Sequence, residues 1–316
     1  MRKLISTKDL SHKEWLRYRK CGIGGSDAGA ICGFNTYVSP MSVYYDKISD
    51  ETEEFDNEAM RQGRDFEDYV ARRFMEATGK KVRRANAIFY DEKHPFMIAD
   101  VDRLIVGENA GLEIKTASPY VESQWTEGKI PLSYQMQCYH YMSIFQADCW
   151  YIAVLIYGRE FKYYKIERDE EIMQSLIQIE KNFWENHMLK RIPPEPDGSK
   201  VANEVIAEHF KESNGSMIPL SGFDEKLSRR AEVIALLDKL TMEKNQIEQE
   251  LKLFLGKAEI AQNDKFYVSW KPVVTNETGE TVSFSETDTV FQTPDFPVLY
   301  RSGCKQEFFP HSDSTE

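Results

Sequence analysis

The chain has 316 residues, of which 41% are hydrophobic and 29% are charged, so it can bury a sizeable core and is not disordered throughout. A formal charge of -12 excludes a protein that coats nucleic acid with its whole surface, but it is compatible with a local channel for DNA. The five cysteines are too sparse for a disulfide framework or a zinc site, and no apolar run approaches the ~20 residues of a membrane helix.

The first two predicted helices carry candidate functional residues. One begins near Ser26 or Asp27, where the segment GIGGSD combines flexible glycines with residues that favour helix N-caps. Backbone N–H groups at such a helix start attract anions. A second helix is expected from about Glu58 to Thr78, and it places Glu67 at the border of its apolar face.

The next segment predicts a β-hairpin. The residues from Phe96 to Val106 and the run LEIKTA, separated by GENAG, indicate two strands joined by a tight turn. Because side chains alternate along a strand, Glu113 and Lys115 point to the same face, about 6 to 7 Å apart at ~3.3 Å per residue. Asp102 is expected to join them from the neighbouring strand.

The rest of the first half alternates helices with strands. A helix is expected after Pro131 and carries Gln137, and the runs CWYIAVLIY and EFKYYKIE predict a buried strand and a paired outer strand. Asp169 then begins a further helix, which ends before Pro193. These elements predict an α/β fold, with a mixed central sheet flanked by helices.

Composition changes after this core. The segment 191–200 concentrates proline, glycine and charge, so we expect a core domain over residues 1–192, a linker over 193–222 and an extension over 223–316. In the extension, apolar residues from Val233 to Phe254 recur at spacings of four and three, with Lys244 interrupting, which predicts a helical hairpin or a short coiled coil. The end of the chain predicts a strand near Trp270 and then a frayed tail.

The acidic residues Glu67, Asp102 and Glu113 suggest a metal site. Hard cations such as magnesium prefer oxygen ligands, which two or three converging carboxylates supply. Lys115 would orient or help to deprotonate an attacking water and would stabilise charge on a phosphate. Taken alone, the pattern D-x10-E-x-K is weak, because charged residues are common in this chain. In the alternative interpretation Asp102 stabilises a turn, and Glu113 and Lys115 form the solvated face of an edge strand.

Residues 17–188 resemble a known family, the YqaJ-type viral recombinases, also called lambda-exonuclease-like proteins, of the PD-(D/E)XK nuclease superfamily. Four motifs match in order and spacing. They are R-x6-S at Arg19 and Ser26, G-x3-E at Gly63 and Glu67, D-x10-E-x-K at Asp102, Glu113 and Lys115, and Y-x2-Q at Tyr134 and Gln137. The predicted C-terminal helices and the VSW strand also resemble those appended to many bacterial and prophage members.

The resemblance implies a restriction-endonuclease-like core and a 5'-to-3' exonuclease that degrades one strand of linear double-stranded DNA. Its cofactor would be Mg2+, with Mn2+ as a substitute, and its 3' overhangs would serve a RecT-like annealing protein. The resemblance also implies a homo-oligomer, commonly a ring trimer around the duplex, of phage or prophage origin. Because the first residues lack the apolar core of a signal peptide, we expect a cytoplasmic protein with no membrane attachment.

The resemblance also assigns roles to individual residues. Asp102, Glu113 and the backbone carbonyl of Ile114 would hold the metal, and Glu67 would assist the metal shell. Lys115 would position the nucleophilic water, with Gln137 supporting that arrangement. A second set, Arg19 and Ser26, would grip the 5'-phosphate of the DNA.

Three positions depart from the family pattern. Asp100 stands where Ser or Asn is common, and Val101 stands where proline is common. A carboxylate at Asp100 would either join the metal shell or weaken phosphate binding nearby. Tyr139 replaces a frequent glutamine, which affects a secondary contact.

Two other functions stay open from the sequence. The first is a structure-specific or RecB-type endonuclease with the same carboxylates, against which Arg19 and Ser26 argue. The second is a non-catalytic recombination adaptor, against which the intact D-x10-E-x-K motif argues. The basic run 79–85 is either a DNA-backbone contact or a solvated helix exit, and His140 is expected to pack in the core rather than to bind metal.

Overall fold

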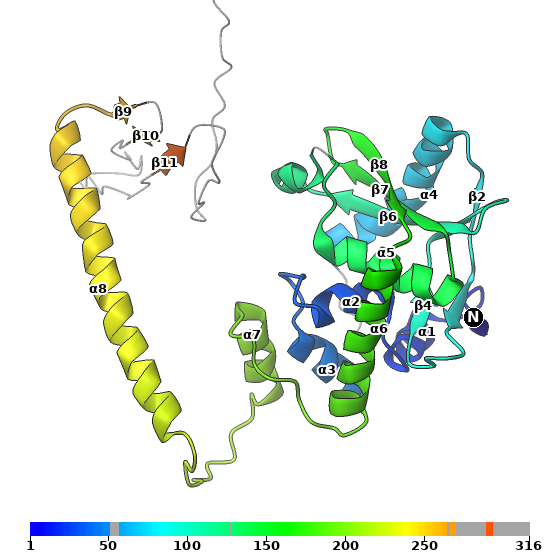
Figure 1. The fold of residues 1–316 in the computed structure, drawn as a ribbon, viewed down its shortest axis with the longest axis horizontal. Coiled ribbons are helices and arrows are strands. Elements are labelled where there is room, and N and C mark those ends of the chain that lie inside the picture. The colour runs from blue at the N-terminus through cyan, green and yellow to red at the C-terminus, as the bar shows by residue number, and fades with distance from the viewer. Residues whose placement is uncertain (51–56, 127, 264–265, 270–288, 293–316) are drawn as a thin grey trace, which may run out of the picture. The chain divides into compact units, whose positions relative to one another are not determined.

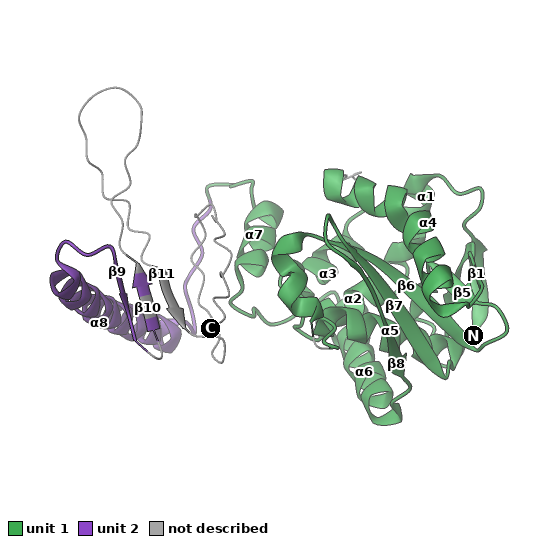
Figure 2. Ribbon diagram, turned by 90° about the horizontal axis from the view of Figure 1, so that it is seen from above, with its two compact units in different colours: residues 1–215 green, residues 216–316 purple. Residues whose placement is uncertain are grey.

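The computed structural model describes residues 1–316 apart from 51–56, 127, 264–265, 270–288 and 293–316. The chain forms two compact units, Met1–Gly215 and Ser216–Glu316, which have different colours in Figure 2. Unit 1 carries all of the predicted site residues. The described part of unit 2 contains one long helix and three short strands.

A mixed sheet of five strands forms the centre of unit 1 (Figure 1). In spatial order the strands are β2 (Val82–Arg83), β5 (Arg103–Ile105), β6 (Ala110–Ala117), β7 (Cys149–Ile156) and β8 (Phe161–Glu167). β6 and β7 are parallel, and the other neighbouring pairs are antiparallel. Nearly every side chain of β7 is buried, as expected for a strand covered on both faces, whereas β8 is partly exposed at the sheet edge. The predicted buried strand and its paired outer strand are therefore confirmed.

Seven α-helices are described in unit 1. They are α1 (His12–Lys20), α2 (Gly25–Ile31), α3 (Pro40–Ile48), α4 (Glu58–Thr78), α5 (Leu132–Phe145), α6 (Glu170–Phe183) and α7 (Lys200–His209). The bounds of α4 and α5 agree with the predicted helices. Asp169 is the N-cap of α6, as predicted, because its side chain accepts the first free backbone N–H groups of that helix.

Helices cover both faces of the central sheet (Figure 1). On one face, Phe74 of α4 packs against Tyr151 of β7, with ring centroids 5.4 Å apart. On the other face, Tyr141 of α5 packs against Trp150, with centroids 5.3 Å apart. Because Trp150 and Tyr151 are neighbours in one strand, their side chains point to opposite faces. This arrangement confirms the predicted fold class.

The strand predicted from Phe96 to Val106 is divided between two sheets. β4 (Ile98–Asp100) belongs to a second sheet with β1 (Arg2–Ser6) and β3 (Ala87–Tyr90), whereas β5 belongs to the central sheet. Asp102 lies between β4 and β5, so its predicted place in a strand is wrong. The physical reason is that its carboxylate, rather than a strand carbonyl, accepts the N–H of Ile114 over 2.7 Å. The hairpin of β5 and β6 is confirmed.

α2 begins at Gly25, one residue before the predicted start, because Gly24 is the N-cap and Asp27 accepts its N–H over 2.8 Å. The glycines of this segment permit close packing. A Cβ atom on Gly25 would lie 2.5 Å from the ring of Tyr141, and one on Gly29 would lie 2.7 Å from the Cα of Ser133. α2 therefore lies against α5 at a separation that side chains at these positions would prevent.

Part of the predicted linker over residues 193–222 is folded. It contains α7, in which His209 packs against Tyr45 of α3 with ring centroids 4.0 Å apart. Ala202 of α7 is buried. The compact unit accordingly continues to Gly215 instead of ending at residue 192.

Unit 2 contains α8 (Asp224–Leu255), a helix of 32 residues, and the antiparallel strands β9 (Ile260–Gln262), β10 (Phe266–Ser269) and β11 (Thr289–Gln292). The predicted helical hairpin is wrong, because α8 is uninterrupted; it contains neither Gly nor Pro, and Lys244 is a good helix former. The strand predicted near Trp270 is confirmed as β10, and the predicted frayed tail lies outside the described residues. None of the helices in the described ranges combines the length and the apolarity needed to cross a bilayer.

Candidate active site

Three of the predicted site residues meet on the α5 side of the central sheet. Lys115 Nζ lies 2.6 Å from Glu113 Oε1, since both residues point to the same face of β6. Gln137 on α5 contacts both of them. Its amide nitrogen donates to Glu113 Oε1 over 2.7 Å, and its amide oxygen accepts from Lys115 Nζ over 3.0 Å. The cluster therefore has a fixed geometry built from one strand and one helix.

Asp102 adds a second carboxylate to this cluster. Burial raises the pKa of Asp102 well above its ordinary value, and the charge of Glu113 adds to the effect while Lys115 opposes it. Burial likewise raises the pKa of Glu113, against the opposing charge of Lys115. Two carboxyl groups placed so closely in partly buried surroundings favour a positive counter-charge between them.

Lys115 keeps its positive charge in these surroundings. Burial by itself lowers the pKa of the ammonium, but the neighbouring carboxylate of Glu113 has the larger effect together with Asp102, so the pKa is raised overall. Lys115 Nζ also lies 4.6 Å over the ring of Tyr134, which favours the charged form further. At neutral pH this side chain is therefore a donor of N–H groups.

The cluster has the oxygen donors that a hard cation requires. Glu113 Oε2 is buried and has no hydrogen-bond partner within the described part of the chain. A strand residue directs its N–H and C=O to the same side, and the Ile114 N–H points to Asp102, so the Ile114 carbonyl lies on that side too. No group of three or more His, Cys, Asp or Glu residues arranged for a metal is found among the described residues. Two carboxylates and a carbonyl still fit Mg2+, which keeps several waters and needs no complete protein cage.

The third predicted metal-shell residue, Glu67, is held by an arginine. It forms an ion pair with Arg103, whose side chain is almost fully buried. Arg103 also donates to Asp68 Oδ1 over 2.6 Å and to the Asp102 carbonyl oxygen over 2.7 Å. This arginine thereby connects α4 to the segment that carries Asp102. Sequence reasoning missed it, and its position next to Asp102 is the signal that could have indicated it.

The predicted phosphate-binding pair lies on α1 and α2. Arg19 Nη2 donates to Ser26 Oγ over 2.7 Å, and the Arg19 guanidinium lies 4.7 Å over the Trp15 ring. The Trp15 indole N–H contacts Asp100, two residues before Asp102. Trp15 and Asp100, which sequence reasoning did not connect, therefore link the pair to the carboxylate cluster.

Tyr141 on α5 connects that helix to Asp100. Its hydroxyl accepts an N–H from Gln137 over 3.0 Å and donates to the Asp100 carbonyl oxygen over 3.1 Å. Tyr141 lies one helical turn after Gln137, so the two side chains share a face of α5. This hydrogen-bond chain fixes Gln137 relative to the β4 segment.

Two other sequence features have defined surroundings. In the basic run 79–85, Lys80 pairs with Glu108 over 2.5 Å and Arg84 pairs with Asp68 over 2.8 Å. DNA contact at this run stays a prediction. His140 is fully buried in the core, where Nδ1 contacts a carboxylate oxygen of Glu180 over 2.8 Å.

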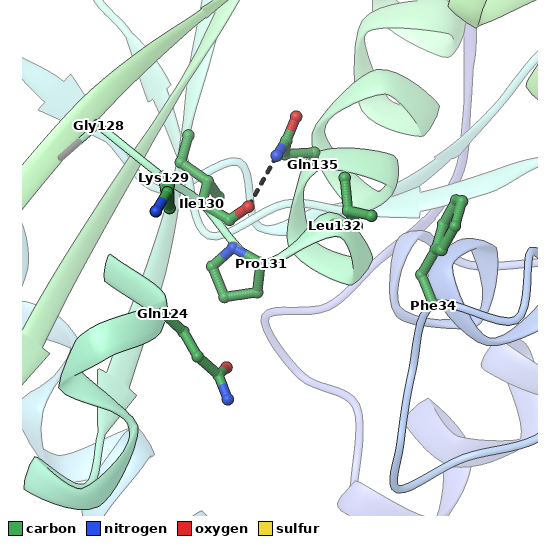
Figure 3. A pocket seen from close by; sticks show the side chains of 8 residues that line it. All are labelled: Phe34, Gln124, Gly128, Lys129, Ile130, Pro131, Leu132 and Gln135. Carbon is green, nitrogen blue, oxygen red and sulfur yellow. Dashed lines mark hydrogen bonds between the residues drawn. The ribbon is translucent and has the colours of Figure 1, made fainter. Parts of the chain in front are cut away.

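A pocket of about 520 Å3 lies at the N-terminal end of α5 (Figure 3). Phe34 and Leu132 give it apolar walls, and Gln124 gives it a polar one. Gln135 donates to the Ile130 carbonyl over 2.7 Å at its edge. The described lining contains none of the predicted site residues, so the carboxylate cluster, rather than this pocket, is the candidate active site.

Comparison with known proteins gives one matching family, one similar protein and two similar solved structures. Residues 14–148 match the family described as the YqaJ-like viral recombinase domain. A protein of Bacillus subtilis strain 168, described as uncharacterized protein YqaJ, is 34% identical over 311 residues, which span 97% of this chain and 95% of that protein. An alkaline exonuclease from Laribacter hongkongensis is 18% identical with a TM-score of 0.48, covering 57% of this chain and 96% of its own. A phage-related exonuclease from Haemophilus somnus 129PT is 10% identical with a TM-score of 0.43, covering 54% and 96% of the two chains.

Proposed function

Because the chain belongs to the family of YqaJ-like viral recombinases, we propose that it is a magnesium-dependent 5'-to-3' exonuclease on linear double-stranded DNA. Its products are 3' single-stranded overhangs, which a RecT-like annealing protein uses in recombination. The observation that carries this proposal is the buried Glu113 Oε2 without a hydrogen-bond partner, beside Asp102 and the ammonium of Lys115. The geometry around this oxygen, with a second carboxylate and an ammonium close by, is what sets it apart from a carboxylate that only balances one neighbouring cation.

In this proposal Asp102, Glu113 and the Ile114 carbonyl hold Mg2+. When bound there, the ion would supply positive charge toward the phosphate oxygens and would make water more acidic. Lys115 donates an N–H to the attacking water and so orients it toward the phosphate. Its raised pKa favours this role over that of a general base. Gln137 fixes the side chains of Lys115 and Glu113 relative to each other through its two amide contacts.

The same proposal gives Glu67 an indirect place in the metal shell. Glu67 holds Arg103, and Arg103 donates to the Asp102 carbonyl, so the carboxylate of α4 supports the loop that carries Asp102. Oε1 of Glu67 is the atom paired with Arg103, so this oxygen could ligate the metal only by leaving Arg103. The ion pair in the metal-free protein therefore favours a role for Glu67 in supporting the Asp102 loop over a role as a metal ligand.

End recognition is assigned to Arg19 and Ser26. A guanidinium offers paired N–H donors that match phosphate oxygens, and Ser26 Oγ lies 2.7 Å from it. The Trp15 ring beneath Arg19 limits the directions in which the guanidinium can move. A terminal 5'-phosphate bound here would set which bond lies next to the carboxylate cluster.

We place the enzyme in the bacterial cytoplasm as a homo-oligomer, with a ring of three chains around the duplex as the proposed form.

The decisive experiment compares three DNA substrates with Mg2+ present. They are linear duplex with a 5'-phosphate, linear duplex with a 5'-hydroxyl, and covalently closed circular DNA. The proposal predicts loss of linear DNA only, faster with the 5'-phosphate. Lys115→Ala is expected to lower the rate by more than about 100-fold, because it removes a charge that acts in the transition state.

Lys165→Ala is the matched control. Lys165 is a half-exposed lysine on β8 that pairs with Glu167 over 2.7 Å, so its loss removes the same charge outside the cluster. Its variant should cut DNA at the wild-type rate. Cutting of circular DNA would favour the endonuclease, and no cutting with either Mg2+ or Mn2+ would favour the non-catalytic adaptor.

A further inference from the structure

The long helix α8 exposes an apolar stripe that is interrupted at Lys244. The stripe follows a heptad repeat whose members are Val233, Leu237, Leu240, Lys244, Ile247, Leu251 and Phe254. Val233, Leu237, Leu240, Ile247 and Phe254 are between 38% and 81% exposed, and Leu255 is the one buried residue of the helix. A repeat sustained over about three heptads is the pattern of helices that pack against another helix. An exposed apolar stripe of this length marks an interaction surface.

The basic residues within the repeat distinguish between partner orientations. Continued toward the N-terminus, the repeat includes Arg230, Lys226 and Phe223, so three of its positions, with Lys244, carry positive charge. If two copies of α8 packed in parallel and in register, each position would face itself. Three layers would then contain facing cations, which is unfavourable in a desolvated seam.

An antiparallel pair removes these clashes. When the pair is centred between Leu237 and Leu240, Arg230 faces Ile247 of the second copy and Lys244 faces Val233 of the second copy. The long basic side chains can then lie along apolar neighbours and extend their charges to water. At both ends of the pair, Phe223 of one copy meets Phe254 of the other.

The charges beside the stripe favour the same orientation. Of the charged residues that directly flank the repeat, Arg229 lies in the N-terminal part of the helix, whereas Glu243, Glu248 and Glu250 lie in the C-terminal part. In the antiparallel pair Arg229 lies across from Glu250 of the second copy. In the parallel pair Glu243 would lie across from Glu248 of the second copy, which is a like-charge contact.

We propose that α8 forms an antiparallel pair with α8 of a second copy of this chain, centred between Leu237 and Leu240. The interface is self-complementary, so it joins chains in twos and closes on itself. At 1.5 Å per residue, the 32-residue helix separates the two ends of the pair by about 48 Å. The proposal does not depend on nuclease activity, because it uses no residue of the carboxylate cluster.

Disulfide crosslinking of the full-length protein tests the orientation. In a background with Cys21→Ser and Cys304→Ser, the double variant Val233→Cys/Lys244→Cys is oxidised beside the two single variants. Antiparallel packing predicts a crosslinked dimer for the double variant and none for either single variant. Eleven residues along one helix span about 16 Å, which is too far for a bond within one chain. Crosslinking of the single variants would contradict the antiparallel orientation, and no crosslinking of any variant would overturn the pair.

Light scattering of the full chain gives a second readout. Leu237→Asp/Leu240→Asp is expected to halve the molar mass, whatever the oligomeric state of unit 1. Met242→Asp is the control, because Met242 is 72% exposed and lies outside the stripe, and it should keep the wild-type mass. Circular dichroism checks that the helix persists. An unchanged mass for the stripe variant would mean that another segment or another protein covers the stripe, and it would overturn the proposal.

Discussion

The indole N–H of Trp15 on α1 donates a hydrogen bond to Asp100 Oδ2 at the end of β4, over 2.5 Å. Asp100 is the residue that departs from the family pattern, and the sequence left open whether it joins the metal shell or weakens phosphate binding. Burial raises the pKa of Asp100, and the Trp15 hydrogen bond opposes that shift. By accepting this hydrogen bond, the Asp100 carboxylate holds in place the Trp15 ring that lies beneath Arg19.

Trp15→Phe tests this support, given the proposed exonuclease. The variant keeps an aromatic ring beneath Arg19 but removes the N–H that Asp100 accepts. Loss of one hydrogen bond to a charged group is expected to lower kcat/KM for 5'-phosphorylated ends roughly tenfold, with a smaller loss on 5'-hydroxyl ends. Trp15→Ala, which also removes the ring, should lose more. Equal losses on both kinds of DNA end would show that Trp15 does not act through phosphate recognition.

Binding of Mg2+ is expected to stabilise the protein against heat. At about 100 times its Kd, a ligand that binds the folded state alone adds about 2.7 kcal/mol to the free energy of unfolding. Glu113→Gln should remove this gain, because it replaces a carboxylate oxygen with an amide. Glu108→Gln, which changes a half-exposed partner of Lys80, is the control and should keep it. An equal rise in Tm for the Glu113 variant would place the ion elsewhere.

The affinity for Mg2+ should also depend on pH. Because the pKa values of Asp102 and Glu113 are raised, these groups hold protons over a wider pH range in the metal-free protein, and the ion must displace them. Affinity is therefore expected to rise as the pH rises through the raised pKa values, and to level off above them. Titration calorimetry in buffers of different ionisation enthalpy measures both the affinity and the released protons. Binding that is independent of pH and releases no protons would contradict the proposed ligands.

Arg103→Met should destabilise unit 1 strongly. Methionine fills a similar volume but leaves Glu67 and Asp68 without the cation that pairs with both of them. Because Glu67 and Asp68 are 31% and 63% exposed, water solvates the remaining carboxylates in part, and urea unfolding should show a loss of about 1 to 3 kcal/mol instead of the full cost of a buried unpaired charge. Arg84→Met is the control, since Arg84 pairs with Asp68 from an exposed position and should cost less than about 1 kcal/mol. Similar losses for both variants would mean that the burial of Arg103 does not increase the contribution of its ion pairs to the free energy of unfolding.

The buried pair of His140 and Glu180 predicts a second pH dependence. Nδ1 contacts a carboxylate oxygen of Glu180 and Nε2 contacts the Ile98 carbonyl over 2.9 Å, so both ring nitrogens face acceptors, which favours the protonated imidazolium. Burial alone lowers the pKa of His140, but Glu180 has the larger effect together with the hydrogen bonds and raises it above 6.5. The stabilisation is present below the ordinary pKa and is lost as the pH rises through the raised value.

Glu180→Gln is expected to remove this stabilisation. The free energy of unfolding should fall by about 3 to 5 kcal/mol near pH 6, and by less near pH 9, where the wild type has lost part of the same contribution. Glu185→Gln changes an exposed partner of Lys181 and serves as the control. A deficit that is constant across this pH range would mean that His140 does not titrate there.

The sequence determined the elements with strong local signals. The helical period ending at Gly79 fixed α4, and the apolar run at Cys149 fixed β7, because periodicity and terminal residues act over short distances in the chain. Alternation along β6 placed Glu113 and Lys115 on one face. The motif order indicated the family, since spacing between matched residues is itself a property of the sequence.

Tertiary structure decided the partners of those residues. Arg103 is marked in the sequence only by its position next to Asp102, and Trp15 carries no motif signal. Their roles arise from contacts with Glu67 and Asp100 across 36 and 85 positions of the chain. The division of the predicted strand at Asp102 likewise depends on the Ile114 N–H, which donates to the Asp102 carboxylate instead of to a strand carbonyl. Local pattern sets which face a side chain takes, whereas hydrogen bonds and burial between distant segments set what it meets there.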